Sequence, residues 1–538
     1  MKIITGVLFF AAALRCGPAA AMPPEAEAVF EKAGVKLTDA DLYRVAEIYN
    51  FWDQKGESVW PGVDMTTTPV QLVFPAKLGV LIGHPNPPEG CIKEDIKLPG
   101  FNKTFCHRPD RSFLYGAATG REGRSMVVSL NPMDLYEEYI KDYYARNNIK
   151  AEKYTKPYLQ YLGEAAHELL HAHQARESRY LPEKEKEVNP PKLNKADYPY
   201  QDEENCLLLG LEGRVLADLL DATDPAGVRE LWRDFTLLRS ARHRRLPGDI
   251  VRLEQYMELS EGTAQYVGWT VQYGANGDVK PLPETSADPR FTGYASSDTL
   301  SGMIKQNLLA LENPRQGRMM PYVYFTGVAL VSSMEKAVPG WKKDIFRKIF
   351  GFRSGLDGLI TAKIKPEGSD KERLKAVFAR YKADEIRARV KESLDKDLAD
   401  NKAKLDKFYA APGRRYAFSF RGVKPVDAMV FAPGLLTEYK ALRVYEAGIT
   451  KIICNYGKKN EKKVEFSKNL PVLHDRAGGG FELAAAGGEV PVIKADKTDV
   501  KKDRTVYRGG VEFSNGIFSW KGDKLEVAEK DGVTRLIF

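Results

Sequence analysis

Residues 155–176, TKPYLQYLGEAAHELLHAHQAR, contain the motif that most constrains this chain, HELLH at residues 167–171. Apolar side chains recur through the stretch at helical spacing and no proline follows Pro157, so we predict one helix with a buried side. Histidines at positions i and i+4 share a helical face. His167 and His171 are therefore expected to point the same way, as two ligands of one tetrahedral zinc site would.

Glu168 is placed for a different role. It follows His167 by one residue, which is about 100° around a helix, so its carboxylate is expected beside a metal ion rather than on it. A general base for a zinc-activated water must lie there. The alternative is a buried helix with incidental histidines. The chain has only seven histidines in 538 residues, and a chance HExxH is expected in roughly one such chain in a hundred or fewer.

The first 21 residues are predicted to be an export signal. Lys2 precedes an apolar run, residues 3–14, that is too short to span a bilayer, and small residues follow up to Ala21. We expect cleavage after Ala21 and a secreted or periplasmic protein. A lipoprotein anchor at Cys16 is the alternative, which Arg15 disfavours. No later stretch is apolar enough for a transmembrane segment.

Charge and cysteine usage limit the partners and the compartment. The net charge is +8, and the basic residues are mixed with acidic residues along the chain. This mixture is typical of a solvated surface, so we expect no nucleic-acid partner. The sequence carries no signal for the oligomeric state. Export permits disulfides, and Cys91 with Cys106, close together in a Gly/Pro-rich segment, is the favoured pair.

Hydrophobic patterning predicts an α+β fold in three parts after the signal peptide, residues 1–21. Residues 22–150 are predicted to form an α/β subdomain with a small sheet. Residues 151–410 are predicted to be largely helical and to carry the zinc site. Residues 411–538, with short alternating runs and Gly-rich turns, predict an all-β accessory domain. The strands expected in the first part are residues 69–74, 78–82 and 125–130.

Three histidines and one loop near the motif need an interpretation. Residues 181–201 place four prolines among Lys and Glu, so we predict a long surface loop or a lid next to the site.

His84 and His107 fall in predicted loops and are expected to bond to backbone rather than to a metal. His173 lies about 200° around the helix from His171. It is expected to point away and to leave the fourth metal position open.

Residues 252–272, RLEQYMELSEGTAQYVGWTVQ, are the second informative stretch. Glu254, Glu258 and Glu261 lie at i, i+4 and i+7 of a predicted helix, so their carboxylates should share one face. Such carboxylates repel one another unless a cation or hydrogen-bond donors face them. We expect a zinc ion to supply that charge.

The HExxH helix followed by EGTAQY at residues 261–266, an E-G-x-A-x-Y pattern, resembles the gluzincin metallopeptidases, in particular the peptidase MA-like group. The resemblance implies a zincin-like fold, a small sheet packed on a largely helical domain. It also implies a zinc ion (Zn2+) held by His167, His171 and Glu261, with Glu168 activating a water as the fourth ligand.

The resemblance spans residues 60–350 and includes one departure. Gluzincins commonly place the third ligand a few tens of residues after the second histidine, whereas here 89 residues, 172–260, intervene. The Pro-rich loop and two added helices account for the length, since loop closure costs rise slowly with length. The gap leaves Glu258 as an alternative ligand to Glu261.

Residues 321–327, PYVYFTG, open a helix that is expected to run to about Lys336. Gluzincins often use a tyrosine or histidine from a downstream element to hydrogen-bond the developing oxyanion, a role that a phenol can fill. The resemblance therefore makes Tyr322 and Tyr324 candidates for this role. A tyrosine packed in the core is the alternative for each.

These features predict an exported zinc-dependent peptidase that acts on a peptide or protein substrate. One alternative is a binding protein with a structural or vestigial zinc site, whose β domain recognises a polysaccharide or a surface protein. Another is a zinc hydrolase of a non-peptide bond, because a metal-activated water is not selective for amides. A structural site is closed by a protein ligand, whereas a catalytic site keeps a water.

Overall fold

The computed structural model describes residues 34–538 with internal gaps. The expected signal peptide and most of the expected lid lie outside the described residues. Among the described helices, none has the length and hydropathy needed to cross a membrane. The internal residues outside the description are 76, 95–96, 110–115, 123, 147–156, 178–197, 276–277, 315–318, 344, 347–354, 365–369, 421–427, 432–435, 441, 447, 450, 455–461, 469, 476–479 and 486–490.

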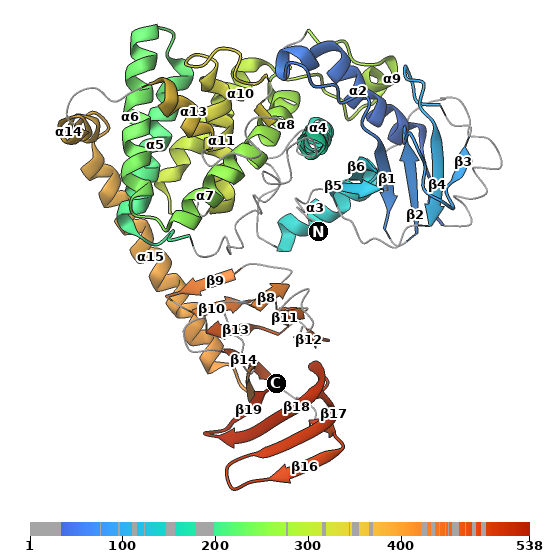
Figure 1. The fold of residues 1–538 in the computed structure, drawn as a ribbon, viewed down its shortest axis with the longest axis vertical. Helices are drawn as coiled ribbons and strands as arrows, with labels where there is room; N and C mark the ends of the chain where they lie inside the picture. The colour runs from blue at the N-terminus through green and yellow to red at the C-terminus, as the bar shows by residue number, and fades with distance from the viewer. Residues whose placement is uncertain are drawn as a thin grey trace. The chain divides into compact units, whose positions relative to one another are not determined.

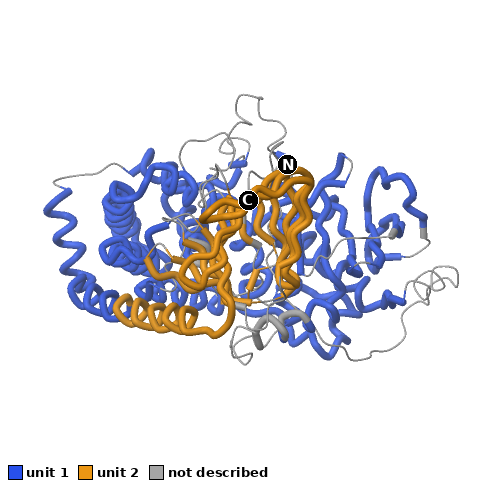
Figure 2. The backbone as a smooth tube through the Cα atoms, turned by 90° about the horizontal axis from the view of Figure 1, so that it is seen from below, with its two compact units in different colours: residues 1–393 blue, residues 394–538 orange. Residues whose placement is uncertain are grey.

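The chain divides into two compact units, unit 1 (residues 1–393) and unit 2 (residues 394–538), shown in different colours in Figure 2. The division falls inside helix α15 (Ala383–Ala410), whereas the sequence predicted a boundary at the end of that helix. The C-terminal part of α15 belongs to unit 2 because it packs on strands there. The apolar cluster at this contact consists of Leu405, Phe408, Val444 and Leu473.

The described part of unit 1 opens with helix α2 (Asp39–Val59), which is followed by a six-stranded sheet (Figure 1). The sheet has the strand order β3-β4-β2-β1-β6-β5, in which β1 and β6 are parallel and the other neighbours are antiparallel. Every residue of β1 and β2 is buried, as their continuous apolar sequences require. The strands are β1 (Val70–Phe74), β2 (Leu78–Ile82), β3 (Ile92–Glu94), β4 (Phe105–Pro109), β5 (Ala117–Glu122) and β6 (Ser125–Leu130).

The three strands expected from the sequence are confirmed, and so is the disulfide between Cys91 and Cys106. The disulfide ties the start of β3 to β4 at one side of the sheet. At the opposite side, β5 pairs with β6 alone among the described strands. The sheet therefore has an edge at β5.

The rest of unit 1 is helical. The helix expected at residues 155–176 is found as α4, and the two added helices expected between the HExxH motif and the second informative stretch are found as α5 and α6. The helices are α2 (Asp39–Val59), α3 (Met133–Arg146), α4 (Pro157–Glu177), α5 (Glu203–Asp221), α6 (Pro225–His243), α7 (Gly248–Met257), the π-helical turn η4 (Glu258–Gly262), α8 (Thr263–Tyr273), α9 (Pro283–Ala287), α10 (Ser297–Leu309), the 3-10 turn η5 (Ala310–Glu312), α11 (Met319–Met334), α13 (Leu356–Lys363), α14 (Asp370–Arg380) and the first part of α15.

Helix α4 joins the two halves of unit 1. One side packs on strands β5 and β6, and another packs on α8 (Figure 1). Leu162, Ala166 and Leu169 are buried, as the helical spacing of apolar residues predicted. The HExxH residues are thus held at the junction of the sheet and the helices.

Unit 2 is all-β apart from the end of α15, and its described strands belong to one 13-stranded sheet. The α+β composition, the small N-terminal sheet and the all-β C-terminal part are therefore as predicted. The strands are β7 (Arg414–Ser419), β8 (Ala428–Phe431), β9 (Leu436–Tyr439), β10 (Leu442–Tyr445), β11 (Lys451–Cys454), β12 (Lys462–Phe466), β13 (Val472–Asp475), β14 (Gly480–Ala485), β15 (Val492–Lys494), β16 (Lys497–Val500), β17 (Thr505–Ser514), β18 (Phe518–Lys530) and β19 (Val533–Ile537).

Candidate metal centre

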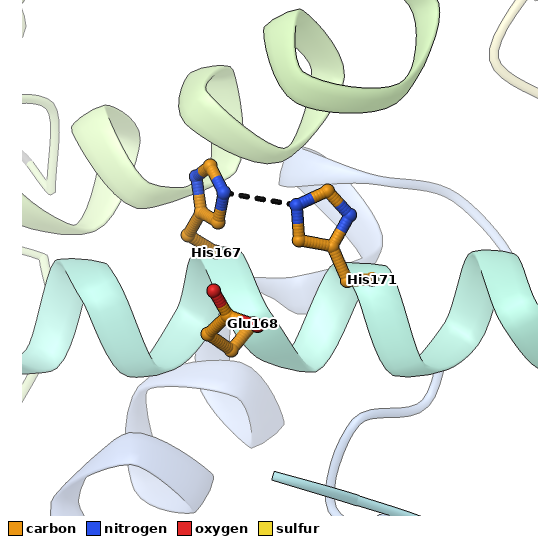
Figure 3. A group of neighbouring side chains, drawn as sticks. All are labelled: His167, Glu168 and His171. Atoms are coloured by element: carbon orange, nitrogen blue, oxygen red, sulfur yellow. Dashed lines mark hydrogen bonds between the residues drawn. The ribbon is translucent and has the colours of Figure 1, made fainter. Parts of the chain in front are cut away.

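The two histidines of the HExxH motif project from the same side of α4, as their spacing predicted (Figure 3). Their Nε2 atoms face each other at 3.0 Å. His167 is buried and His171 is partly buried. The helix therefore holds two imidazole nitrogens together at the junction described above.

The carboxylate of Glu261 completes a triangle with the two imidazoles. Glu261 Oε2 lies 3.6 Å from His167 Nε2 and 3.4 Å from His171 Nε2. Two ligand atoms that each lie about 2.0–2.1 Å from a tetrahedral zinc ion are about 3.3–3.4 Å from each other. The edges of the triangle, 3.0, 3.4 and 3.6 Å, lie near this value. The donor types and their spacing therefore fit a zinc ion.

The electrostatics of the triangle favour a cation. Burial opposes the ionisation of Glu261, but the two imidazoles outweigh it and hold the pKa of this carboxyl well below its usual range. Burial likewise disfavours the charged form of His171, but Glu261 outweighs it and raises the pKa of this imidazole to about 9. A metal ion would take the place of the proton that these groups attract.

A π-helical turn interrupts the helix that carries Glu261. The sequence predicted one regular helix over residues 252–272, with three glutamates on one face. In the structure α7 continues through η4 into α8, and Glu261 lies within the π turn. A π turn holds more residues than an α turn and so shifts the faces that follow it. Glu261 meets the histidines, whereas Glu254 and Glu258 meet other partners.

Glu254 and Glu258 face arginines of α6, so donors from the protein, rather than a zinc ion, compensate these two carboxylates. Arg239 donates to both carboxylate oxygens of Glu258, at 2.8 and 3.0 Å. Arg242 donates to both oxygens of Glu254, at 2.8 and 2.7 Å. Glu212 of α5 accepts from both arginines. This Arg–Glu cluster occupies the carboxylate of Glu258, the alternative ligand.

The Arg–Glu cluster is buried, with no member more than 3% exposed. It contains three glutamates and two arginines, and His243 Nε2 lies 2.9 Å from Glu254 Oε1. Burial raises the pKa of Glu258 to about 7, with Glu254 adding to the rise against the pull of Arg239.

The two candidate tyrosines have different surroundings. The Tyr322 hydroxyl donates to Glu254 Oε2 at 2.5 Å and so belongs to the Arg–Glu cluster rather than to the triangle. The Tyr324 hydroxyl donates to Glu261 Oε2 at 2.9 Å. Tyr322 is thus a buried core tyrosine, the alternative weighed from the sequence. Tyr324 reaches the site, where it orients Glu261.

Glu168 lies beside the two histidines, and its side chain is anchored to the sheet. The three motif side chains offer ligand atoms that lie within 4.8 Å of one another. The Thr119 hydroxyl, on edge strand β5, lies 2.6 Å from the Glu168 backbone carbonyl oxygen and 2.8 Å from its carboxylate Oε2, and its one hydrogen is shared between them. The general-base candidate is therefore held between α4 and the sheet edge.

Two pairs of glycines let the helices of the site approach closely. A Cβ on Gly163 or on Gly268 would lie 2.7 Å from the carbonyl oxygen of the other, where α4 crosses α8. A Cβ on Gly262 would lie 2.6 Å from the Cα of Gly327, where η4 meets α11. These contacts leave no room for a side chain, so the glycines set the distance between the helices that carry the triangle.

The remaining histidines considered from the sequence lie outside the triangle. His84 bonds to backbone, with Nε2 3.3 Å from the Glu122 carbonyl oxygen and Nδ1 accepting from Asn86 N at 3.2 Å. His107 lies on strand β4 rather than in the expected loop. His173 packs its ring against Phe346, 5.7 Å between centroids, and so points away as expected.

Sequence reasoning missed three kinds of partner at this site, namely Thr119, the arginines of the Arg–Glu cluster, and Gln174, whose amide contacts His171. Each of these residues contacts a site residue that is far away in the sequence. Gln174 also lies three residues after His171, and this spacing is the only signal that the sequence offered.

No protein-family model, curated protein or solved structure matches this chain. The geometry of the site therefore carries the functional argument.

Gly268→Ala tests the close crossing of α4 and α8. The new Cβ would meet the Gly163 carbonyl and force the helices apart, which we expect to lower the free energy of unfolding of unit 1 by about 1–3 kcal/mol, the usual cost of overpacking. Gly302→Ala in α10 is the matched control, because no atom beyond its own helix lies within 4 Å of the position that the new Cβ would take, and it is expected to raise stability by about 0.5–1 kcal/mol. Urea denaturation measures both, and wild-type stability of Gly268→Ala would contradict the crossing.

Proposed function

We propose that this protein is a zinc-dependent peptidase of the gluzincin type, with a zincin-like domain in unit 1. The observation that carries the proposal is the triangle of His167, His171 and Glu261, with edges of 3.0–3.6 Å. The HExxH helix and the later E-G-x-A-x-Y segment supply these groups, as in the family that the sequence resembles. In this proposal the three side chains hold one Zn2+.

The residues around the triangle have separate tasks in the proposed hydrolysis. Zinc, when bound there, polarises a substrate carbonyl and lowers the pKa of water. The Glu168 carboxylate accepts a proton from the attacking water and returns it to the leaving amine. Thr119 holds that carboxylate toward the sheet edge, and Tyr324 orients Glu261. A hydrogen bond from Tyr324 to the oxyanion would require its hydroxyl to leave Glu261.

The surroundings of the triangle favour a catalytic site over a structural one. A structural zinc site is closed by a fourth protein ligand, commonly Cys or His. Among the described side chains, the candidate metal group adds only Glu168 to the two histidines and Glu261. Glu168 is committed to Thr119, and His173 faces Phe346. The fourth ligand position of a bound zinc ion is therefore left for water. A catalytic site requires this open position, whereas a binding protein with a structural zinc site does not.

Edge strand β5 supports a peptide as the substrate. Its Thr119 contacts Glu168, so the strand runs beside the proposed general base. An extended peptide adds to an exposed sheet edge through main-chain hydrogen bonds. In this way β5 would align a substrate strand along α4. The Cys91–Cys106 disulfide supports the proposed export, because such bonds persist in oxidising compartments.

Glu261→Gln and Glu258→Gln form a matched pair that tests the ligand set. Both replace a buried carboxyl group within η4 by an amide and keep the side-chain size. We expect wild type and Glu258→Gln to bind about one Zn2+ per chain, and Glu261→Gln to lose most of it, because a catalytic site needs three protein ligands. Metal analysis after dialysis measures the content. Zinc retained by Glu261→Gln and lost by Glu258→Gln would reverse the assignment.

Glu168→Gln tests the general base. The amide cannot take a proton from water, so hydrolysis of an unstructured protein substrate should fall by about 10²–10⁴-fold, while the zinc content stays at the wild-type level. The control is the zinc content itself, measured on the same preparation. Full activity of Glu168→Gln would exclude this mechanism. A wild type that holds zinc but cleaves no peptide would favour the binding-protein or non-peptide alternatives.

N-methylated peptides test substrate addition to β5. In an added strand, alternate backbone N–H groups face the sheet edge, so methylation at those positions should weaken binding by about 1 kcal/mol each, roughly fivefold. Methylation of the intervening positions is the control and should leave KM unchanged. The measurement is KM for a series of singly methylated peptides. An equal effect at all positions would argue against strand addition.

A further inference from the structure

Gln174 lies on α4, three residues after His171, and its buried amide joins the two helices of the triangle. Its Oε1 lies 2.8 Å from His171 Nδ1. Its Nε2 donates to the Ser260 carbonyl oxygen at 3.0 Å and to the Thr263 hydroxyl at 2.8 Å. Gln174 is only 3% exposed. One side chain thus contacts His171 and the segment that carries Glu261.

The partners of Gln174 determine the orientation of its amide. A carbonyl oxygen such as that of Ser260 can only accept a hydrogen bond, so the NH2 group must face it. Thr263 strengthens this orientation, because its hydroxyl hydrogen is donated to the Leu259 carbonyl at 2.6 Å and leaves the oxygen to accept. A reversed amide would set two oxygens against each other. The Gln174 oxygen therefore faces His171.

The orientation of Gln174 determines which nitrogen of His171 carries hydrogen. An amide oxygen only accepts, so Nδ1 of His171 must donate to it. The imidazole that has its hydrogen on Nδ1 has its lone pair on Nε2. Nε2 is the atom that faces His167 at 3.0 Å and Glu261 at 3.4 Å. The tautomer set by Gln174 is the one that offers a lone pair to the triangle.

We propose that Gln174 is a positioning residue for the metal centre, which fixes the tautomer and ring orientation of His171 and ties them to the segment of Glu261. This inference rests on the proposed function, because it assumes that the triangle binds Zn2+. Partners of this kind raise metal affinity by about 10–100-fold when they orient a ligand. Gln174 does so with the same amide that fastens α4 to η4 and α8.

Two variants separate positioning of His171 from fastening of the helices. Gln174→Met has similar length and can no longer accept from His171 Nδ1. Thr263→Val removes one acceptor of the Gln174 NH2 group and leaves the contact with His171 intact. Gln174→Glu is the conservative variant for the contact with His171, because its carboxylate still accepts from Nδ1, although its second oxygen then faces the Ser260 carbonyl and no longer fastens the helices. The readouts are Zn2+ affinity, by competition with a chelator, and the absorption spectrum of the protein loaded with Co2+.

We expect Gln174→Met to bind Zn2+ about 10–100-fold more weakly and to change the Co2+ spectrum. Gln174→Glu should bind within about threefold of wild type, as rescue by a retained acceptor requires. Thr263→Val should keep the affinity and lose thermal stability. Wild-type affinity of Gln174→Met, or an equal loss in Gln174→Met and Thr263→Val, would overturn the inference and leave the proposed function standing. A wild type that binds no Zn2+ would overturn both.

Nuclear magnetic resonance on the zinc-loaded wild type gives a test that needs no variant. Long-range 1H–15N spectra distinguish protonated from metal-bound ring nitrogens. We expect the His171 Nδ1 to carry a slowly exchanging hydrogen and its Nε2 to be the coordinating atom. Coordination through Nδ1, or a His171 Nδ1 without hydrogen, would overturn the role of Gln174 even if Gln174→Met fails to fold.

Discussion

The close crossing of α4 and α8 at Gly163 and Gly268 is the constraint on which the site depends. Helix axes are usually about 8–10 Å apart because side chains separate them. Here each backbone lies against the other, and a Cβ on either glycine would be 2.7 Å from a carbonyl oxygen. A wider crossing would carry Glu261 Oε2 away from the imidazoles, now 3.4 and 3.6 Å distant. The geometry of the triangle thus rests on two residues that have no functional group.

A second constraint is the burial of charged side chains in and just before the π turn. Buried ions are strongly destabilising when one partner is missing, and the segment from Glu254 to Glu261 buries three carboxylates. Arg239 and Arg242 compensate Glu254 and Glu258, and the imidazoles compensate Glu261. The segment is therefore held by the Arg–Glu cluster from one side and by α4 from the other. If the segment from Glu254 to Glu261 were displaced by one residue along its helix, these glutamates would no longer face the arginines and imidazoles that compensate them.

The sequence predicted the features that depend on local spacing. A period of four residues was enough to place both histidines on one face of α4, and alternating and apolar runs were enough to locate β1, β2 and β6. The π turn was not predicted, because tertiary contacts rather than local preference select it. The arginine partners and Thr119 were not predicted either, because they are far in sequence from the residues they contact. Arg239 bonds to Glu212 across 27 residues, and Thr119 bonds to Glu168 across 49. Tyr322 and Tyr324, two residues apart on α11, could not be told apart from sequence, although one joins the Arg–Glu cluster and the other joins Glu261.

The residues that follow Glu261 in the E-G-x-A-x-Y segment determine where its helix passes its neighbours. Gly262 allows α11 to approach, since its Cβ would lie 2.6 Å from Gly327. Ala264 is fully buried, and the Tyr266 hydroxyl accepts from Lys342 at 3.1 Å. Each of these positions fixes where the helix passes rather than taking part in chemistry. In this chain that path brings Glu261, at the first position of the pattern, to the two histidines.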